Sequence, residues 1–252
     1  MNRVTLSSAD GATTTKAPVS KAAGEADSLH SRRRTARAAG LWYLGVAIAG
    51  GLGFLLIRPM IFVDGDPAAT LANLVQRPGL ARAGLVLELA LVVTQAGAAV
   101  WFYKLFRSAN STAAWALAAF GMANAVAIMA SAGFMASALT VSSDFGLAPG
   151  GDAAATVQLL YELSSNSWGV GSLFFGLWLI PMGHIATTSG LMPRWLGRIL
   201  VIGGVGYVLS TFVEYGFADA PTWLSGALPV FAAVGEFWMI FYLLFKGVRG
   251  PD

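Results

Sequence analysis

The sequence predicts an all-α integral membrane protein, a bundle of six transmembrane helices with both termini inside. Of the 252 residues, 56% are hydrophobic and only 12% are charged, whereas a soluble domain carries about 25% charge. Six apolar segments are long enough to cross a bilayer, which takes about 20 helical residues. Basic residues are concentrated in every second one of the stretches that precede, connect and follow these segments. A chain with so little charge cannot cover a water-facing surface, so we expect its helices to face lipid.

Residues 1–36 differ in composition from the rest of the chain. They are rich in Ser, Thr, Ala and Gly, have no apolar period, and lead into the basic stretch SRRRTAR (31–37). We expect a disordered basic tail over 1–36, followed by a six-helix transmembrane domain over 37–249.

Six segments have the length and composition of spanning helices. They are 38–57, 80–105, 112–140, 165–187, 195–216 and 224–246. In the first, Gly45, Ala49 and Gly53 recur every four residues, which predicts a close-packing face, either inside the protein or between protomers. In the fourth, Pro181 removes one backbone hydrogen bond and predicts a kink.

The basic residues favour one topology. Thirteen Lys and Arg residues lie in the tail, in the loops after the second and fourth spans, and after the sixth span; the other three loops contain only Arg58, Arg77 and Arg82. Basic residues concentrate in cytoplasmic loops. We therefore expect a multi-pass protein of the cell inner membrane, with both termini cytoplasmic.

The three outer loops share an Asp beside a short Ala-rich run. They read GDPAAT (65–70), GDAAAT (151–156) and ADAPT (218–222). We expect each Asp to cap a helix N-terminus, because it accepts the free backbone N–H groups there. A remnant of a triplicated helix hairpin is the alternative.

The first outer loop also has an amphipathic pattern. After Asp66, apolar residues follow helical spacing: Ala68, Leu71, Ala72 and Val75. This spacing predicts a short interfacial helix on the outer membrane face.

One carboxylate stands within the last span, in the stretch AAVGEFWMIFYLLF (232–245). A carboxylate at the middle of a spanning helix costs about 2.5–3.5 kcal/mol, so Glu236 should face protein. Small residues precede it, Ala232, Ala233 and Gly235, and they should face the bundle. The aromatic side of the same helix should face lipid: Phe231, Phe237, Trp238 and Phe241.

Other polar residues recur in the predicted spans. On the second span Ala81, Gly84, Glu88, Gln95 and Ala99 lie close to one line of the helix. The candidate intramembrane polar site comprises Glu236, Glu88, Gln95, Asn124, Glu162 and Glu214.

Two interpretations of these residues compete. In the first they form hydrogen bonds between helices, with the deeper carboxyl groups neutral because removal from water favours the neutral acid. In the second they line a polar pocket or proton-coupled path that opens outward. A metal site from Glu88, Glu162 and Glu214 is a weaker alternative, because no helical Glu-x-x-His pattern supports it.

The motifs of several enzyme classes are missing. The chain has no Cys and only two His residues, and it contains no H-E-x-x-H, no G-x-S-x-G and no phosphate-binding P-loop. We therefore expect no enzyme activity, no catalytic, cofactor-binding or metal-binding residues, no cofactor and no nucleic-acid partner. The expected partners are the lipid bilayer and either a second copy or another membrane protein, with an unidentified small-molecule ligand.

The fourth and fifth spans resemble a known bacterial membrane family. The stretch 174–209 has a Phe-rich, Gly-containing span, the loop residues Ser189, Gly190, Pro193 and Gly197, and then Gly206 and Tyr207. GLWYL (40–44), GDPAAT and the Glu of the last span are similar too. In these features 38–247 resembles the family filed as domain of unknown function 4386. The resemblance implies a six-span membrane protein and no particular activity. The chain departs from this resemblance at one position: the resemblance implies a polar residue in the fourth span where this chain has Trp178.

Two functions fit these observations, and an intramembrane enzyme is a third alternative. The first is binding or transport of a small solute or protons through an intramembrane polar pocket. The alternative is a non-catalytic membrane component that packs against a partner protein. A water-filled cavity reaching Glu236 would favour the first. A dry core with an exposed face of small residues would favour the second.

Overall fold

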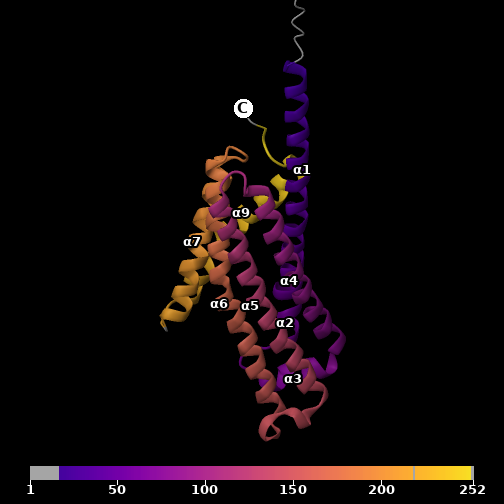
Figure 1. Ribbon diagram of the computed structural model, residues 1–252. Coiled ribbons are helices and arrows are strands. Elements are labelled where there is room, and N and C mark those ends of the chain that lie inside the picture. Colours follow the sequence, from indigo (N-terminus) through magenta and orange to yellow (C-terminus); the bar gives the residue numbers. More distant parts are fainter. Residues whose placement is uncertain (1–16, 218, 251–252) are drawn as a thin grey trace, which may run out of the picture.

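The computed structural model describes residues 17–217 and 219–250, and every regular element in these ranges is helical (Figure 1). The long helices are α1 (Ala17–Gly50), α4 (Pro78–Phe106), α5 (Ser111–Ser143), α6 (Ala153–Thr188), α7 (Arg194–Gly216) and α9 (Val230–Phe241). The short α-helices are α2 (Arg58–Ile61), α3 (Pro67–Gln76) and α8 (Thr222–Ala227). Two π-helices, η1 (Gly51–Ile57) and η4 (Tyr242–Lys246), extend α1 and α9, and two 3₁₀ turns, η2 (Phe145–Leu147) and η3 (Pro149–Gly151), join α5 to α6.

Six helical stretches in the described ranges are long and apolar enough to cross a membrane, and each overlaps one predicted span. They are Leu29–Ile61, Pro78–Phe106, Ser111–Ser143, Ala153–Thr188, Arg194–Gly216 and Trp223–Lys246. The prediction of an all-α bundle with six spanning helices is confirmed at this level. It supports a multi-pass membrane protein.

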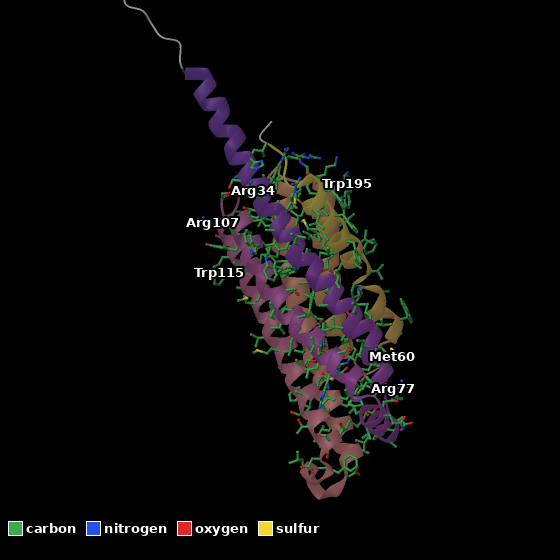
Figure 2. The ribbon with its side chains drawn as sticks, turned by 90° about the vertical axis from the view of Figure 1, so that its right-hand side faces the viewer. Arg34, Met60, Arg77, Arg107, Trp115 and Trp195 are labelled. Carbon is green, nitrogen blue, oxygen red and sulfur yellow. The ribbon has the colours of Figure 1, made fainter. Side chains whose placement is uncertain are left out.

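The spanning helices pack mainly against their neighbours in the chain. In the order α1, α4, α5, α6, α7, α9, each helix contacts the next one. α9 and η4 in turn contact α1. Basic side chains mark one end, where Figure 2 shows Arg34 and Arg107, while Arg77 lies toward the opposite end. We call the first the basic end and the second the α3 end, because α3 lies there (Figure 1).

Two boundaries differ from the sequence-based expectation. α1 begins at Ala17, so the second half of the predicted disordered tail is helical, and residues 1–16 lie outside the described ranges. Ala, Glu and Arg in this stretch are good helix formers that continue the first span. The helix that contains the fourth span, α6, begins at Ala153 rather than 165, because the polar residues near the predicted start are part of the same, longer helix.

Pro181 lies inside α6 and does not end it, since the helix continues to Thr188.

Asp residues cap two of the three predicted helices. Asp66 Oδ1 accepts a hydrogen bond from the Ala69 N–H at 2.9 Å, and Asp152 Oδ1 accepts one from the Ala155 N–H at 2.9 Å. The third prediction is wrong, since α8 starts after Pro221 with no side-chain cap. The short helix predicted after Asp66 is present as α3. That this helix lies on a membrane surface remains a prediction.

Small residues allow the helices to approach closely. The Gly45–Ala49–Gly53 face packs inside the protein against α4: a Cβ at Gly45 would lie 2.7 Å from Thr94 Cγ2, and one at Gly53 would lie 3.1 Å from Leu87 Cβ. α6 and α7 meet through two glycine pairs. A Cβ at Gly176 would lie 2.5 Å from the Gly204 carbonyl oxygen, and one at Gly183 would lie 2.5 Å from that of Gly197.

Two apolar cores divide the bundle along its length. The larger lies toward the basic end and contains Tyr43, Phe102 and Trp178. The smaller lies toward the α3 end and contains Ile61, Leu74 and Val157 among others. α3 is held there by Thr70, whose hydroxyl donates to the Val63 carbonyl at 3.1 Å and accepts from the Val63 N–H at 3.0 Å.

The α6–α7 contact predicts a specific sensitivity to added volume. Gly183→Ala should lower the free energy of unfolding by about 1–3 kcal/mol, because the new methyl group must push two backbones apart. Gly133→Ala is the matched control: Gly133 is exposed on α5 and a Cβ there meets nothing within 4 Å. It should be neutral or stabilising by up to about 1 kcal/mol. Unfolding of the purified protein in detergent checks both; equal effects of the two changes would contradict the packing argument.

Candidate functional site

A buried cluster of four polar side chains joins four elements. Arg58, at the start of α2, donates from Nη1 to Glu88 Oε1 of α4 at 3.1 Å and from Nη2 to Ser164 Oγ of α6 at 3.1 Å. Ser131 of α5 donates to Glu88 Oε2 at 3.3 Å, and its Oγ lies 2.7 Å from Ser164 Oγ. All four residues are at most 5% exposed. The ion pair is therefore fully enclosed by protein.

Aromatic rings surround the Arg58 guanidinium. Its Cζ lies 5.3 Å from the ring centre of Phe54, 5.9 Å from Phe62 and 5.1 Å from Tyr161. Rings at these distances attract a cation through their negative faces. On each of its helices the cluster lies between residues of the two apolar cores. It is a polar layer that separates them.

The second polar site pairs Glu236 with Tyr43. The Tyr43 hydroxyl of α1 donates to Glu236 Oε1 of α9 at 2.6 Å, a short distance typical of a hydroxyl bound to a carboxylate. Tyr43 is 1% exposed, with its ring 5.4 Å from Phe102 and 5.5 Å from Trp178. Glu236 itself is only half-buried. The carboxyl group is thus held on one side and open on the other.

Glu236 opens into a cavity of about 250 Å³. The walls come from α1, η1, α4, α6, α7 and α9, and apart from Glu236 and the two phenols of Tyr43 and Tyr207 they are almost entirely apolar. Beyond Tyr43, η1 lines the cavity with Gly51, Phe54 and Leu55. The result is an apolar chamber with one carboxyl group.

An aromatic pair stands between the chamber and the buried ion pair. Phe54 and Trp168 both line the cavity, and their ring centres lie 4.3 Å apart. Phe54 also lies under the Arg58 guanidinium. The indole of Trp168 lies near Glu88, although its Nε1 has no hydrogen-bond partner by distance and angle. The two polar sites are therefore neighbours with a shared aromatic wall.

The predicted face of α4 is buried throughout: Ala81, Gly84, Glu88, Gln95 and Ala99 are all covered. Gln95 and Asn124 are 0% and 2% exposed. Both side-chain polar atoms of Gln95 and the Nδ2 of Asn124 lack a hydrogen-bond partner in the described part of the chain.

The six residues of the candidate polar site therefore do not form one site. Glu88 belongs to the ion-pair cluster, Glu236 to the cavity, and Gln95 and Asn124 to the bundle interior. Glu162 is half-buried and accepts from Gln158 Nε2 at 3.0 Å, while Glu214 is exposed. Among the residues that the structure describes, no three His, Asp or Glu side chains form a group able to hold a metal. The proposed Glu88–Glu162–Glu214 metal site is thus not assembled.

The aromatic and small sides of α9 are mostly as predicted. Phe231, Phe237 and Phe241 are more than half exposed, and Ala232 and Gly235 are buried. Trp238 differs, because it packs partly against the larger core. Ala233 also differs: it is exposed and lines the cavity beside Glu236.

Two residues of these polar sites, Arg58 and Tyr43, are not among the candidates that the sequence indicated. Arg58 was counted as a loop cation, but it is buried at the end of the first span. Its position directly after the apolar run GLGFLLI (51–57) was the available signal, since a cation there needs a partner. Tyr43 gave no signal beyond its place in GLWYL, because a Tyr near a helix end is common at membrane interfaces.

The ion pair predicts a large asymmetry between single and double substitutions. Glu88→Gln should lower the free energy of unfolding by about 3–5 kcal/mol, because it leaves the Arg58 charge buried without its partner. Replacing both Arg58 and Glu88 with Met should recover most of that loss. The exposed Glu214→Gln is the control and should not change stability measurably. A Glu88→Gln variant as stable as the wild type would show that the pair carries no buried charge.

The chain is similar to known sequences over part or most of its length. Seventy-nine residues are 30% identical to an uncharacterized protein of Archaeoglobus fulgidus, and this match covers 31% of the chain and 44% of that protein. No solved structure matches the chain significantly. Residues 38–247 match the family described as Domain of unknown function (DUF4386), and this range contains five of the six spanning helices in full and residues 38–61 of the first. The match confirms the resemblance seen in the sequence, and the chain belongs to this family.

Proposed function

We propose that this protein binds a small, largely apolar molecule in the cavity beside Glu236. The observation that carries the proposal is the half-buried carboxyl group of Glu236, which Tyr43 holds at 2.6 Å in the wall of an otherwise apolar chamber. A dry, fully packed bundle would leave neither the space nor the open face of the carboxyl group. Binding sites are typically apolar cavities with a few convergent polar groups, and this chamber fits that description.

The chamber favours a molecule with a single polar end. Glu236 and the Tyr43 hydroxyl can engage one hydroxyl or amino group, and the apolar walls suit a hydrocarbon body. A volume of about 250 Å³ lies at the small end of ligand pockets, which are typically ~300–1,000 Å³. The ligand would therefore be a compact amphiphile rather than a whole phospholipid.

The helix geometry around the cavity supports a binding role. η1, which lines the chamber, is a π-helix of seven residues, and such segments are frequent at functional sites. No catalytic motif accompanies the site, so the proposal is binding, with transport of the ligand as an extension, rather than chemistry.

The proposed orientation places the basic end in the cytoplasm. Arg37, Lys104, Arg107, Arg198 and Lys246 all flank the spans at this end. The positive-inside rule then gives cytoplasmic termini and the inner membrane as the location.

Substitution of the carboxyl group tests the proposal. The wild-type protein, Glu236→Gln and Glu214→Gln would be purified from the same host, extracted with organic solvent, and compared by mass spectrometry. We expect at least one small amphiphile enriched with the wild type and about tenfold depleted with Glu236→Gln, equivalent to ~1.4 kcal/mol of lost affinity. Glu214→Gln changes an exposed carboxylate in the same way and should retain the molecule.

Thermal unfolding of the three proteins guards against misfolding as the cause. Tyr43→Phe should deplete the same molecule less than Glu236→Gln, since it removes one hydroxyl and leaves the carboxyl group. Equal small-molecule content in all four proteins would rule out Glu236 as part of a binding site.

A further inference from the structure

We infer that the ligand reaches this cavity sideways from the hydrocarbon layer of the bilayer, through an opening between η1 and α9. The inference rests on the proposed function and names its substrate class: a membrane-dissolved amphiphile, rather than a solute taken up from water.

The rim of the cavity is apolar and exposed. Leu55 of η1 is 74% exposed, and Phe237 of α9 is 53% exposed. Ala233, also on α9, is exposed as well, and all three line the cavity. A mouth with such a rim offers nothing to a hydrated solute. It is compatible with lipid chains.

The depth of the mouth places it inside the hydrocarbon layer. Glu236 precedes Lys246 by ten residues, or about 15 Å of helix, which is half the thickness of a ~30 Å hydrocarbon core. Arg37 and Arg58 are separated by 21 residues of α1 and η1, about 31 Å. Gly51 and Leu55 lie within that interval. The mouth therefore faces lipid tails rather than either aqueous phase.

The two lengthwise routes into the chamber are closed. Toward the α3 end stand the Phe54–Trp168 pair and, behind it, the buried Arg58–Glu88 ion pair. Toward the basic end α1 meets η4 so closely that a Cβ at Gly40 would lie 3.0 Å from Leu243 Cβ. Only the side between η1 and α9 retains exposed lining residues.

Photolabelling in lipid nanodiscs tests both the site and the route. The first probe is an octanol that carries a photoreactive diazirine, and the second is a phosphatidylcholine with a diazirine in the middle of one acyl chain. Labelled residues are identified by mass spectrometry. We expect the octanol to label Glu236 and its cavity neighbours, and the phospholipid to label the rim at Leu55 and Phe237.

Variants that block the opening between η1 and α9 with a large side chain test the route, each compared with a control variant at an exposed site. Gly51 lines the cavity and a Cβ there meets nothing within 4 Å, so Gly51→Phe can place a ring in the mouth without a backbone clash. It should reduce octanol labelling of Glu236 about tenfold. Gly133→Phe, at an exposed glycine of α5 with equally open space, should leave labelling unchanged. Ala233→Phe plugs the opposite rim and serves if Gly51→Phe does not fold.

The outcomes separate the two proposals. No octanol labelling in the cavity of the wild type would overturn the proposed function and the route together. Octanol labelling that survives both plugs, or a rim that the acyl-chain probe never labels, would overturn lateral access and leave the cavity as a binding site reached from water.

A different observation supports a second inference: we propose that the layer formed by Gln95, Asn124 and Gly171 binds ordered water. The register of the helices brings these residues together. Glu88 contacts Ser131, and Ser131 contacts Ser164. Seven residues toward the basic end on each helix, about 10.5 Å away, stand Gln95, Asn124 and Gly171.

The contacts around this layer agree with that register. A Cβ at Gly171 would lie 3.8 Å from Asn124 Oδ1, and one at Gly121 would lie 3.2 Å from Ala99 Cβ on the next turn. The layer presents two amide donors and one acceptor without protein partners. Water both donates and accepts, and it needs two to four polar partners at such a site. A cation would require several oxygens, which this layer does not supply.

The sign of one stability change distinguishes a wet layer from a dry one. Gln95→Met keeps the volume but removes the amide. In a hydrated layer it removes hydrogen bonds to water and lowers the thermal midpoint. In a dry layer the same substitution removes two unpaired buried polar atoms, so the thermal midpoint rises. Leu117→Met, at another fully buried site, measures the cost of Met alone.

A density map that resolves ordered water decides the matter directly. We expect a peak about 2.7–3.2 Å from the amides of Gln95 and Asn124. A raised midpoint for Gln95→Met, an empty layer in the map, or a peak with the short contacts of a metal ion would each overturn the second inference.

Discussion

The buried ion pair between Arg58 and Glu88 is the interaction on which the arrangement of the first four spans depends. Removing a guanidinium and a carboxylate from water costs several kcal/mol for each ion, and that cost is offset only where the geometry and the remaining hydrogen bonds are good. Here Ser131 and Ser164 supply those hydrogen bonds, and Phe54, Phe62 and Tyr161 supply the rings. The end of the first span, α4, α5 and α6 must therefore meet in one register.

The chamber follows from the same constraint. With Arg58 fixed, Phe54 lies one turn earlier and packs tilted against Trp168, which closes the chamber toward the α3 end. At the basic end Tyr43, Phe102 and Trp178 pack edge to face. Between these two aromatic groups α1 contributes Gly50, η1 contributes Gly51, and α9 contributes Ala233. Large aromatic side chains close both ends of the chamber, and the small residues between them leave an open space beside Glu236.

The sequence predicted the helices better than the sites. Hydropathy and length located all six spans, and the line from Ala81 to Ala99 on α4 is buried as its spacing indicated. Pairing was beyond reach, because nothing local to Glu88 or Glu236 names Arg58 or Tyr43 as its partner. Charge counting even placed Arg58 in a loop. The grouping of six polar residues into one site failed for a related reason: depth along a helix can be read from the sequence, but which helices adjoin cannot.

The unequal lengths of the helices have a mechanical consequence. α7 has 23 residues and α6 has 36, and the end of α7 meets α6 where Tyr215 donates to Asn166. Thirteen residues of α6, 153–165, or about 20 Å, extend past that point together with α5, as Figure 1 shows. The part of the α5–α6 hairpin beyond this point does not pack against α7 or α9. α6 is one uninterrupted helix from its tip to Trp168, so a sideways force on the tip acts as a lever on the chamber wall.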